Sequence, residues 1–430
     1  MLRFLKLKNV GPAREMDFAP GKRLNIITGD NGLGKSFLLD LAWWAVTRSW
    51  SGIPVQPPTN SSEPAKIDVQ FAAKTKMANF NIAYDRADQT WRFPKGQPGQ
   101  PGLVVYARVD GDFAVWDSNR RFGDREEMES GVPKGLVFAR EQVWNGLPLA
   151  GKPICNGLLA DWTSWQQTES WEASALANAL ERLSPSEDRP IRPGIPTRVD
   201  ILDSRSIPTL HMPYGQDVPV THASAGMKRV LGLAYLLVWA WREHLEVSRI
   251  AGRKTAERML VIIDEVEAHL HPKWQRVILS SIVDALTQLT RQKSLGQNGS
   301  DPPKIQYVVA THSPLVLASL EPIFDASLDA MFELQLDEST EQSVVKLSQA
   351  DFRRRGDAAK WLESEAFGMA SSRSVPAEQM INEASELLKR TLHPSPTQII
   401  AMEERLSTVL PDIDPFWIRW RAATLIEPIQ

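Results

Sequence analysis

The chain has 430 residues, a length that predicts two or three packed units with enough interior for a sizeable core. Its 49 Lys and Arg against 52 Asp and Glu give a net charge of -3, which lacks the overall positive charge of many nucleic-acid-binding proteins without excluding a local basic surface. The single cysteine, Cys155, excludes an internal disulfide framework, and no apolar run approaches the roughly 20 residues that span a bilayer, so we expect a cytoplasmic protein without a membrane segment.

The first part of the chain predicts strands on either side of a glycine-rich loop. Alternating apolar and basic residues over 1–8 predict one strand, and the apolar run 24–28 predicts another that leads directly into the loop. The segment 37–46 has the length and composition of a buried helix. Further strands and a hairpin that turns at Asp110-Gly111 are expected over 67–71, 80–84 and 103–116.

The rest of the chain alternates predicted helices with predicted strands. Residues 120–200 mix charges, tryptophans and prolines around a helix expected over 161–183. The later elements are a helix, a strand, a helix, a strand, a hairpin and a helical end, over 225–245, 259–263, 274–289, 305–310, 331–347 and 352–430. Alternation of this kind predicts an α/β fold with a mostly parallel sheet.

The segment 29–36, Gly-Asp-Asn-Gly-Leu-Gly-Lys-Ser, has the spacing of a phosphate-binding P-loop. Glycines at 29, 32 and 34 would let backbone N–H groups surround phosphate oxygens, and the helix that follows favours an anion at its N-terminus. Lys35 would reach the terminal phosphates of ATP, and the Ser36 hydroxyl would bind Mg²⁺. We expect the cofactor-binding residues here to be Gly29, Asp30, Asn31, Gly32, Leu33, Gly34, Lys35, Ser36 and Phe37.

Two further candidate segments each place polar residues after an apolar run. Asp264 and Glu265 follow the predicted strand 259–263, as in a Walker B motif, where the first acid would hold Mg²⁺ and the second would orient or deprotonate the attacking water. The alternative is that this acidic pair only begins a helix. His312 follows the strand 305–310 and could contact a γ-phosphate, although a lone histidine is often structural and Ser313 could simply cap a helix.

These motifs, in this order, resemble the ABC-type ATPases of the SMC and RecF branch, including the stand-alone bacterial ATPases of the OLD-like and phage-defence groups. The resemblance lies in segments 5–36 and 264–272 and in His312, which matches the switch histidine. It implies a P-loop head of the ABC type with antiparallel N-terminal strands, an inserted helical subdomain and a helical C-terminal region. The expected boundaries are 1–119, 120–200, 201–348 and 349–430.

The resemblance also implies a shared site between two heads. Segment 223–229 is similar to an ABC signature, in which Ser224 and Gly226 would grip the γ-phosphate bound by a partner head, although Ala225 and Met227 depart from the pattern. Ser224 is equally a helix N-cap candidate. Gln142 and Gln167 are both candidates for the glutamine of the Q-loop, and the sequence does not distinguish between them.

We expect ATP binding to pair two copies of the chain and hydrolysis to separate them, which would regulate a separate effector, such as a nuclease, in bacterial antiviral defence. The main alternative is a RecF-like repair ATPase that binds DNA directly, for which the basic clusters 228–229 and 353–355 are the motive. A nucleotide-gated scaffold and a transporter subunit are further alternatives. The aromatic and basic segment 415–421 could dock a partner if it is exposed, and His269 with His271 could form a metal pair.

Overall fold

The computed structural model describes residues 1–58, 63–72, 77–93, 102–120, 135–149, 151–291, 301–337, 343–390 and 394–424. The chain divides into two compact units, residues 1–358 and 359–430. The first unit therefore includes the range that the sequence assigned to an insertion, of which 121–134 and 150 lie outside the described residues. The second unit begins ten residues later than the boundary expected at 349.

An antiparallel sheet near the N-terminus is built from amphipathic strands. In β1 (Leu2–Val10) the side chains of Leu5 and Leu7 are fully buried, whereas Lys6 between them pairs with Glu15 on β2. This alternation is the strand pattern that the sequence predicted. The strand order is β2-β1-β4-β5-β6, with bounds β2 Ala13–Phe18, β4 Lys66–Ala72, β5 Met77–Asp85 and β6 Thr90–Arg92.

The central sheet has eight strands in the order β18-β17-β3-β16-β15-β7-β8-β9. Its five middle strands, from β17 to β7, run parallel, and β18, β8 and β9 pair antiparallel at the edges. The mostly parallel sheet predicted from the sequence is confirmed. The strands are β3 Leu24–Gly29, β7 Gly102–Ala107, β8 Phe113–Asp117, β9 Leu136–Phe138, β15 Arg258–Ile263, β16 Lys304–Ala310, β17 Ala330–Asp337 and β18 Val344–Ala350.

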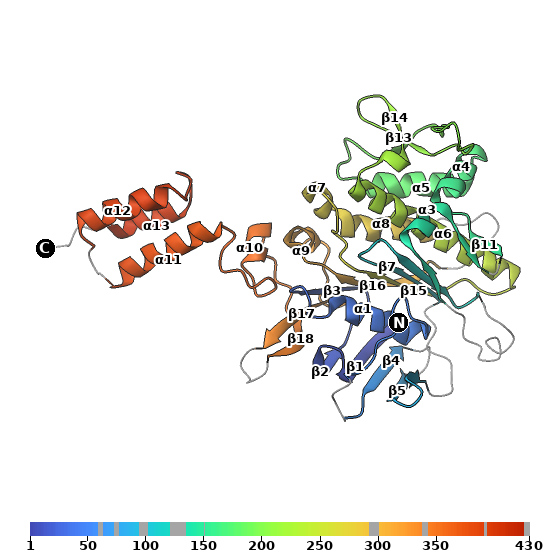
Figure 1. Cartoon of the computed structure of the whole chain (residues 1–430), viewed down its shortest axis with the longest axis horizontal. Helices are drawn as coiled ribbons and strands as arrows, with labels where there is room; N and C mark the ends of the chain where they lie inside the picture. Colours follow the sequence, from blue (N-terminus) through green and yellow to red (C-terminus); the bar gives the residue numbers. More distant parts are fainter. Residues whose placement is uncertain are drawn as a thin grey trace. The chain divides into compact units, whose positions relative to one another are not determined.

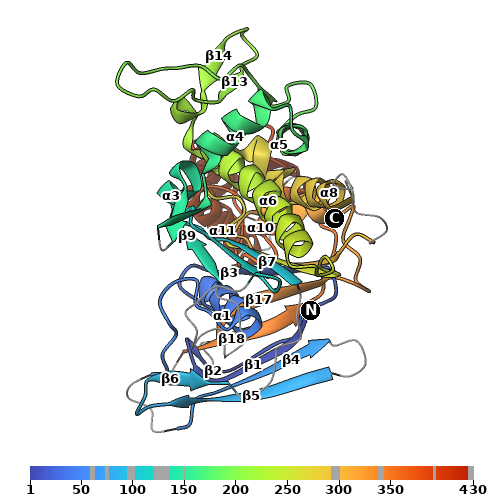
Figure 2. The same cartoon turned by 90° about the vertical axis from the view of Figure 1, so that its right-hand side faces the viewer.

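Helix α1 (Lys35–Thr47) lies between the two sheets, as Figures 1 and 2 show. It contacts β1 on one side and the parallel strands on the other, so apolar residues occur all around it rather than on one face. Trp43 and Trp44 are buried there, and they join both sheets in one hydrophobic core. On the opposite face of the central sheet lie α6 (Ala225–Ile250) and α8 (Ile278–Arg291).

Two helices expected from the sequence are each divided in the structure. The region 161–183 forms α4 (Leu158–Gln167) and α5 (Trp171–Arg182), because Glu169 adopts a left-handed φ of 50° that ends the first helix. Likewise α7 (Pro272–Gln275) precedes α8. The other elements of this part are α3 Arg140–Asn145, β10 Leu147–Leu149, β11 Lys152–Cys155, β12 Arg192–Pro193, β13 Thr209–His211, β14 Asp217–Pro219, the 3-10 turn Val220–His222 and α9 Pro314–Leu320.

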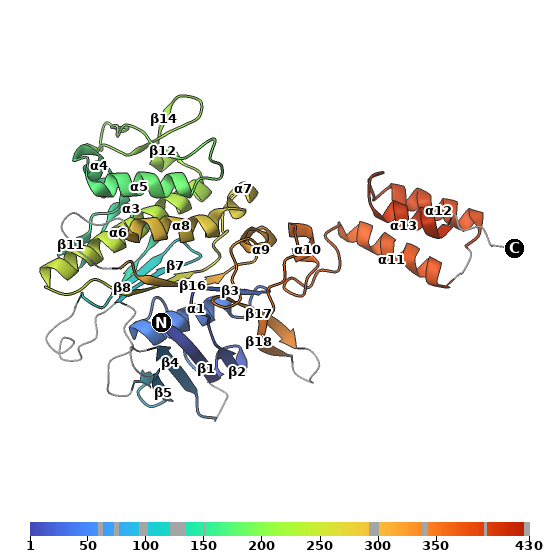
Figure 3. The ribbon, with the colours of Figure 1, turned by 180° about the vertical axis from the view of Figure 1, so that it is seen from behind.

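After α10 (Ala358–Leu362), the second unit consists of three helices that lie alongside one another (Figure 3). They are α11 Val375–Arg390, α12 Pro396–Ser407 and α13 Phe416–Thr424. Phe416, Trp417 and Trp420 form the core of this unit with residues of α11 and α12. Docking of a partner by the segment 415–421 required exposed aromatic rings, and these three rings do not meet that condition, because they fill the space between the helices. None of the described helices has both the length and the apolar character needed to cross a bilayer.

Candidate functional site

The glycine-rich loop connects β3 directly to α1, as the sequence predicted. Strand β3 ends at Gly29, where a Cβ atom would lie 2.3 Å from the carbonyl oxygen of Leu334 on the neighbouring strand. Gly34 precedes the helix with a left-handed φ of 98°, and a Cβ atom there would lie 2.7 Å from Cγ of Pro12. Both positions require glycine, because any side chain would displace the backbone of the loop.

The ammonium group of Lys35 lies inside this loop. Its Nζ donates to the carbonyl oxygens of Gly29 at 2.7 Å and Asp30 at 2.8 Å, and the residue is 6% exposed. Burial lowers the pKa of Lys35, and the nearby carboxylates of Glu265 and Asp264 oppose this shift. The loop thus surrounds the Lys35 side chain, and two nearby carboxylates favour its charged form.

The remaining loop residues divide into an exposed group and a packed group. Asp30, Asn31, Gly32 and Ser36 are exposed to solvent. Leu33 and Phe37 pack against the hydrophobic core, and the Phe37 ring occupies the space beside Gly11 that a Cβ atom would need. The side chains of Leu33 and Phe37 are thus partly buried, whereas the other four are open to solvent.

Asp264 follows β15 at the same edge of the central sheet and lies close to Ser36. The residue is 2% exposed, and burial raises the pKa of Asp264, while hydrogen bonding with the Ser36 hydroxyl acts in the opposite direction. No described residue donates a hydrogen bond to its buried Oδ1 atom. A buried acceptor without a donor is unfavourable, and a carboxylate with a hydroxyl is a donor set that suits Mg²⁺. The residues present therefore fit a magnesium ion.

Glu265 and His312 meet next to this position. The Nε2 atom of His312 lies 3.5 Å from Oε1 of Glu265, and both side chains are partly exposed. Glu265 has a left-handed φ of 47°, which turns the chain sharply after the strand. Burial first, and Lys35 second, lower the pKa of His312. The structure thus brings Lys35, Asp264, Glu265 and His312 to the carboxyl ends of three adjacent parallel strands, where ligands of open α/β sheets bind.

Glu267 is a residue of this site to which the sequence analysis assigned no role. Its carboxylate accepts hydrogen bonds from the Thr311 hydroxyl at 2.9 Å and from the backbone N–H of His312. Burial raises the pKa of Glu267. Nearby, the Ser313 hydroxyl donates to Gln275 at 2.8 Å and accepts from the Val316 N–H, so Ser313 also caps α9. Glu267 connects the turn after β15 to the loop that carries His312.

Arg229 is a second residue beside the site for which the sequence predicted no role there. Its guanidinium donates to the backbone carbonyls of Arg108 and Val109 at 3.3 and 2.8 Å, and to those of Asp264 and Glu265 at 3.0 Å each. Burial lowers the pKa of Arg229. Residues 228–229 form one of the two basic clusters behind the alternative of direct DNA binding. The contacts of Arg229 do not favour that alternative, because its guanidinium holds the backbone beside the acidic pair.

The signature-like segment lies at the start of α6. Ser224 is exposed and caps this helix, since its hydroxyl accepts a hydrogen bond from the Met227 N–H at 3.3 Å. Gly226 is buried, and a Cβ atom there would lie 2.5 Å from the carbonyl oxygen of His269. Within the described part of the chain, no hydrogen bond or ion pair joins Ser224 to the phosphate loop. Its role in a partner's site stays a proposal.

The remaining sequence candidates have local structural roles. His271 caps α7, and its Nδ1 accepts from the Lys273 N–H at 3.3 Å. No group of three or more His, Cys, Asp or Glu residues that could hold a metal ion occurs among the described residues. The Gln142 side chain accepts a hydrogen bond from the Ala139 N–H at 2.8 Å at the start of α3, and Gln167 is exposed at the end of α4. Cys155 is buried against Tyr235, and burial raises the pKa of its thiol to about 11.

The mostly parallel sheet, with the glycine-rich loop between β3 and α1, has the α/β architecture that the sequence predicted. Residues 144–318, which contain the signature-like segment, Asp264, Glu265 and His312, match the family described as "AAA domain, putative AbiEii toxin, Type IV TA system". The retron Vc95 probable ATPase of Vibrio cholerae is 36% identical over 61 residues, and the Septu protein PtuA of Bacillus mycoides is 38% identical over 61 residues. These matches cover 14% of this chain in each case and only 9% and 6% of the two relatives.

Solved structures of SMC heads are also similar to this chain. The SMC head domain from Thermotoga maritima has 13% sequence identity and a TM-score of 0.41, with 81% of this chain and 99% of that chain covered. An SMC head solved in complex with the C-winged helix domain of ScpA has 14% identity and a TM-score of 0.41, with coverage of 81% and 97%. The predicted resemblance to AAA-type ATPases of defence systems is confirmed at the level of these partial matches.

Proposed function

We propose that the chain binds ATP at the loop 29–36 and hydrolyses it with Glu265 as the residue that activates water. The observation that carries this proposal is the convergence of Lys35, Asp264, Glu265 and His312 at one edge of the parallel sheet. A glycine-rich loop alone would explain phosphate binding only. The added acidic pair supplies both a cation ligand and a base within the same site.

Each side chain has a separate role in the proposed reaction. The Lys35 ammonium neutralises charge on the terminal phosphates, and the N–H groups of the loop bind their oxygens. Ser36 and Asp264 would hold Mg²⁺, which supplies further charge neutralisation when bound. Glu265 orients the attacking water and accepts its proton, and His312, 3.5 Å from that carboxylate, contacts the γ-phosphate.

Hydrolysis would be completed by a second copy of the chain. Ser224 is exposed at the start of α6, and helix N-termini favour anions, so this segment is suited to face the γ-phosphate of a partner head. In this proposal, ATP pairs two heads and hydrolysis separates them. We further propose that this cycle regulates a separate effector, such as a nuclease, in bacterial antiviral defence. The names of the two relatives, a retron ATPase and a Septu protein, support that setting.

The experiment compares the wild type with Lys35→Ala and Glu265→Gln for ATP binding, oligomeric state and turnover. Lys35→Ala should lose ATP binding, because it removes the cation from the centre of the loop. Glu265→Gln should bind ATP, hydrolyse it slowly and accumulate paired heads. Lys22→Ala, which removes an exposed lysine just ahead of β3, is the matched control and should leave all three measurements unchanged. Normal turnover in Glu265→Gln would exclude Glu265 as the base.

A further inference from the structure

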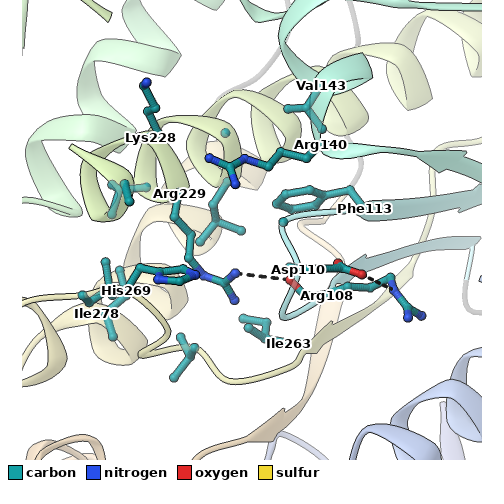
Figure 4. A pocket seen from close by; sticks show the side chains of 18 of the residues that line it. Arg108, Asp110, Phe113, Arg140, Val143, Lys228, Arg229, Ile263, His269 and Ile278 are labelled. Atoms are coloured by element: carbon teal, nitrogen blue, oxygen red, sulfur yellow. Dashed lines mark hydrogen bonds and ion pairs between the residues drawn. The ribbon is translucent and has the colours of Figure 1, made fainter. Parts of the chain in front are cut away.

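A cavity of about 110 Å³ lies next to the candidate ATP site (Figure 4). It is enclosed by the turn between β7 and β8, by α3, by the first turns of α6 and by the segment that follows β15. Its lining contains no residue of the loop 29–37, and neither Asp264, Glu265 nor His312. The cavity is therefore separate from the position proposed for ATP.

The walls of this cavity combine an apolar interior with basic side chains. The apolar part includes Phe113, Val143, Leu233, Val266 and Ile278. The basic residues are Arg108, Arg140, Lys228 and Arg229, against one acidic residue, Asp110. This excess of positive charge favours an anionic group on any ligand that enters.

Arg140 is the basic residue best placed to bind that group. Arg108 pairs with Asp40 at 2.8 Å, and the guanidinium of Arg229 is already hydrogen-bonded to backbone carbonyls. The guanidinium of Arg140, by contrast, has no hydrogen-bond or ion-pair partner within the described part of the chain. Its stem packs on Gly111, and Figure 4 shows Arg140 extending from α3 toward α6, whereas Arg229 extends from α6 toward the turn at Asp110.

The volume of the cavity limits the size of the ligand that it can hold. Pockets that hold a drug-sized ligand measure roughly 300–1,000 Å³, so this cavity is too small for a whole nucleotide. An engineered apolar cavity of about 150 Å³ in another protein binds benzene, and the cavity in this chain is of similar size. We propose that the cavity binds a small organic anion, with one aromatic ring or a short branched chain against the apolar wall and its charged group on Arg140.

Such a ligand would also act on the candidate ATP site through Arg229. This side chain lines the cavity, and its guanidinium holds the carbonyls of Asp264 and Glu265 at 3.0 Å. A ligand in the cavity packs against the Arg229 side chain, so binding that displaces this side chain would disturb the backbone at Asp264 and Glu265 and should lower turnover. This regulatory step rests on the proposed ATPase activity, whereas the binding itself does not.

The binding test uses 3-phenylpropionate and its neutral analogue 3-phenylpropan-1-ol as probes, with the full chain, titrated by calorimetry and by ligand-observed NMR. The wild type should bind the acid at least about tenfold more tightly than the alcohol, since a hydrogen bond to a charged group contributes about 1.5 kcal/mol or more. Arg140→Gln should remove this preference. Leu233→Trp, which fills the cavity, should abolish binding of both probes, and Lys152→Gln on β11 is the control that should change neither.

Equal binding of acid and alcohol by the wild type, or no binding of either, would overturn the proposal. Unchanged binding in a folded Leu233→Trp variant would do the same. If Leu233→Trp does not fold, Arg140→Gln still tests the proposal, because Arg140 is exposed to solvent. Turnover is then measured with and without the acid. A chain that binds the acid but does not hydrolyse ATP refutes the proposed function, whereas a normal ATPase that ignores the acid refutes only this inference.

Discussion

The carboxylate of Glu267 accepts a hydrogen bond from the backbone N–H of His312. The same carboxylate accepts from the Thr311 hydroxyl at 2.9 Å. One acidic side chain on the turn after β15 therefore determines where the loop after β16 places its histidine. Because Glu265 precedes Glu267 by two residues, the candidate base and its histidine neighbour are positioned by a single short segment.

Glu267→Gln should lower ATP turnover at least about tenfold while ATP binding is retained. The glutamine amide can accept from the His312 N–H, but the Thr311 hydroxyl would have to turn and accept from the NH₂ group, and both charge-assisted hydrogen bonds of the carboxylate are lost. Steady-state turnover and nucleotide binding are to be measured on the same preparations. Glu378→Gln, which makes the same change in the second unit, is the control. Unchanged turnover in Glu267→Gln would show that His312 is positioned by other contacts.

Two glycines of α6 should respond in opposite ways to alanine. Gly226→Ala places a Cβ atom 2.5 Å from the His269 carbonyl oxygen, so it should displace the turn after β15, destabilise the first unit and reduce turnover. Gly232→Ala meets only Cγ1 of Val143 at 3.7 Å, an ordinary contact, and should stabilise the helix by about 0.5–1 kcal/mol. Thermal unfolding and turnover distinguish the two. Equal stability of both variants would contradict the close packing at Gly226.

The pKa of His312 should depend on its charged neighbours in a defined direction. Burial and Lys35 lower this pKa below its usual value of 6.5, and Glu265 opposes them. Lys35→Ala should therefore raise the pKa of His312, and Glu265→Gln should lower it further. NMR titration of the histidine ring resonances, assigned with His312→Asn, measures both shifts.

The sign of the accompanying effect on stability follows from the same shift. The unfolded chain binds a proton on this histidine at a higher pH than the folded chain does. The contribution of neutral His312 to folding is therefore complete above pH 6.5 and is lost as pH falls from 6.5 through the folded-state pKa. If Lys35→Ala leaves the pKa of His312 unchanged, the Lys35 ammonium does not lie close enough to the His312 ring to influence it.

The second unit should depend on Trp420 for its folding. This side chain is fully buried between the three helices, and its Nε1 donates to Glu403 at 3.0 Å. Trp420→Ala should cost about 3–5 kcal/mol, which is a large share of the stability of a unit this small. Ile418→Ala on the same helix removes a side chain that is 74% exposed and should cost under about 0.5 kcal/mol. Limited proteolysis of the full chain should cut the second unit rapidly only in Trp420→Ala.

Much of the central fold could be predicted because its signals are contiguous in the sequence. The apolar strands expected over 259–263 and 305–310 are Arg258–Ile263 and Lys304–Ala310 in the structure. The strand, loop and helix around Lys35 follow from an apolar run, closely spaced glycines and a second apolar run. Each element carries its own local pattern, so neighbouring structure changes its limits by only one or two residues.

The features that could not be predicted depend on contacts between distant residues. Arg229 resembles a surface cation until the backbone carbonyls of the residues that follow β7 and β15 are placed around it. Glu267 has no role until β16 brings Thr311 beside it. The break between α4 and α5 occurs at Glu169, a residue type that gives no local sign of a left-handed conformation. Burial of Trp417 and Trp420 likewise depends on α11 and α12.

The position of β3 has a consequence for the synthesis of the protein. This strand precedes the phosphate loop and emerges early from the ribosome, yet both of its neighbours, β16 and β17, are translated much later. The hydrogen bond from Asn25 to the Tyr307 carbonyl spans 282 positions of the chain. Pairing at such separation closes late in folding. The loop proposed to bind ATP is translated well before β16 and β17, so we expect a growing chain not to capture ATP until both strands have been made.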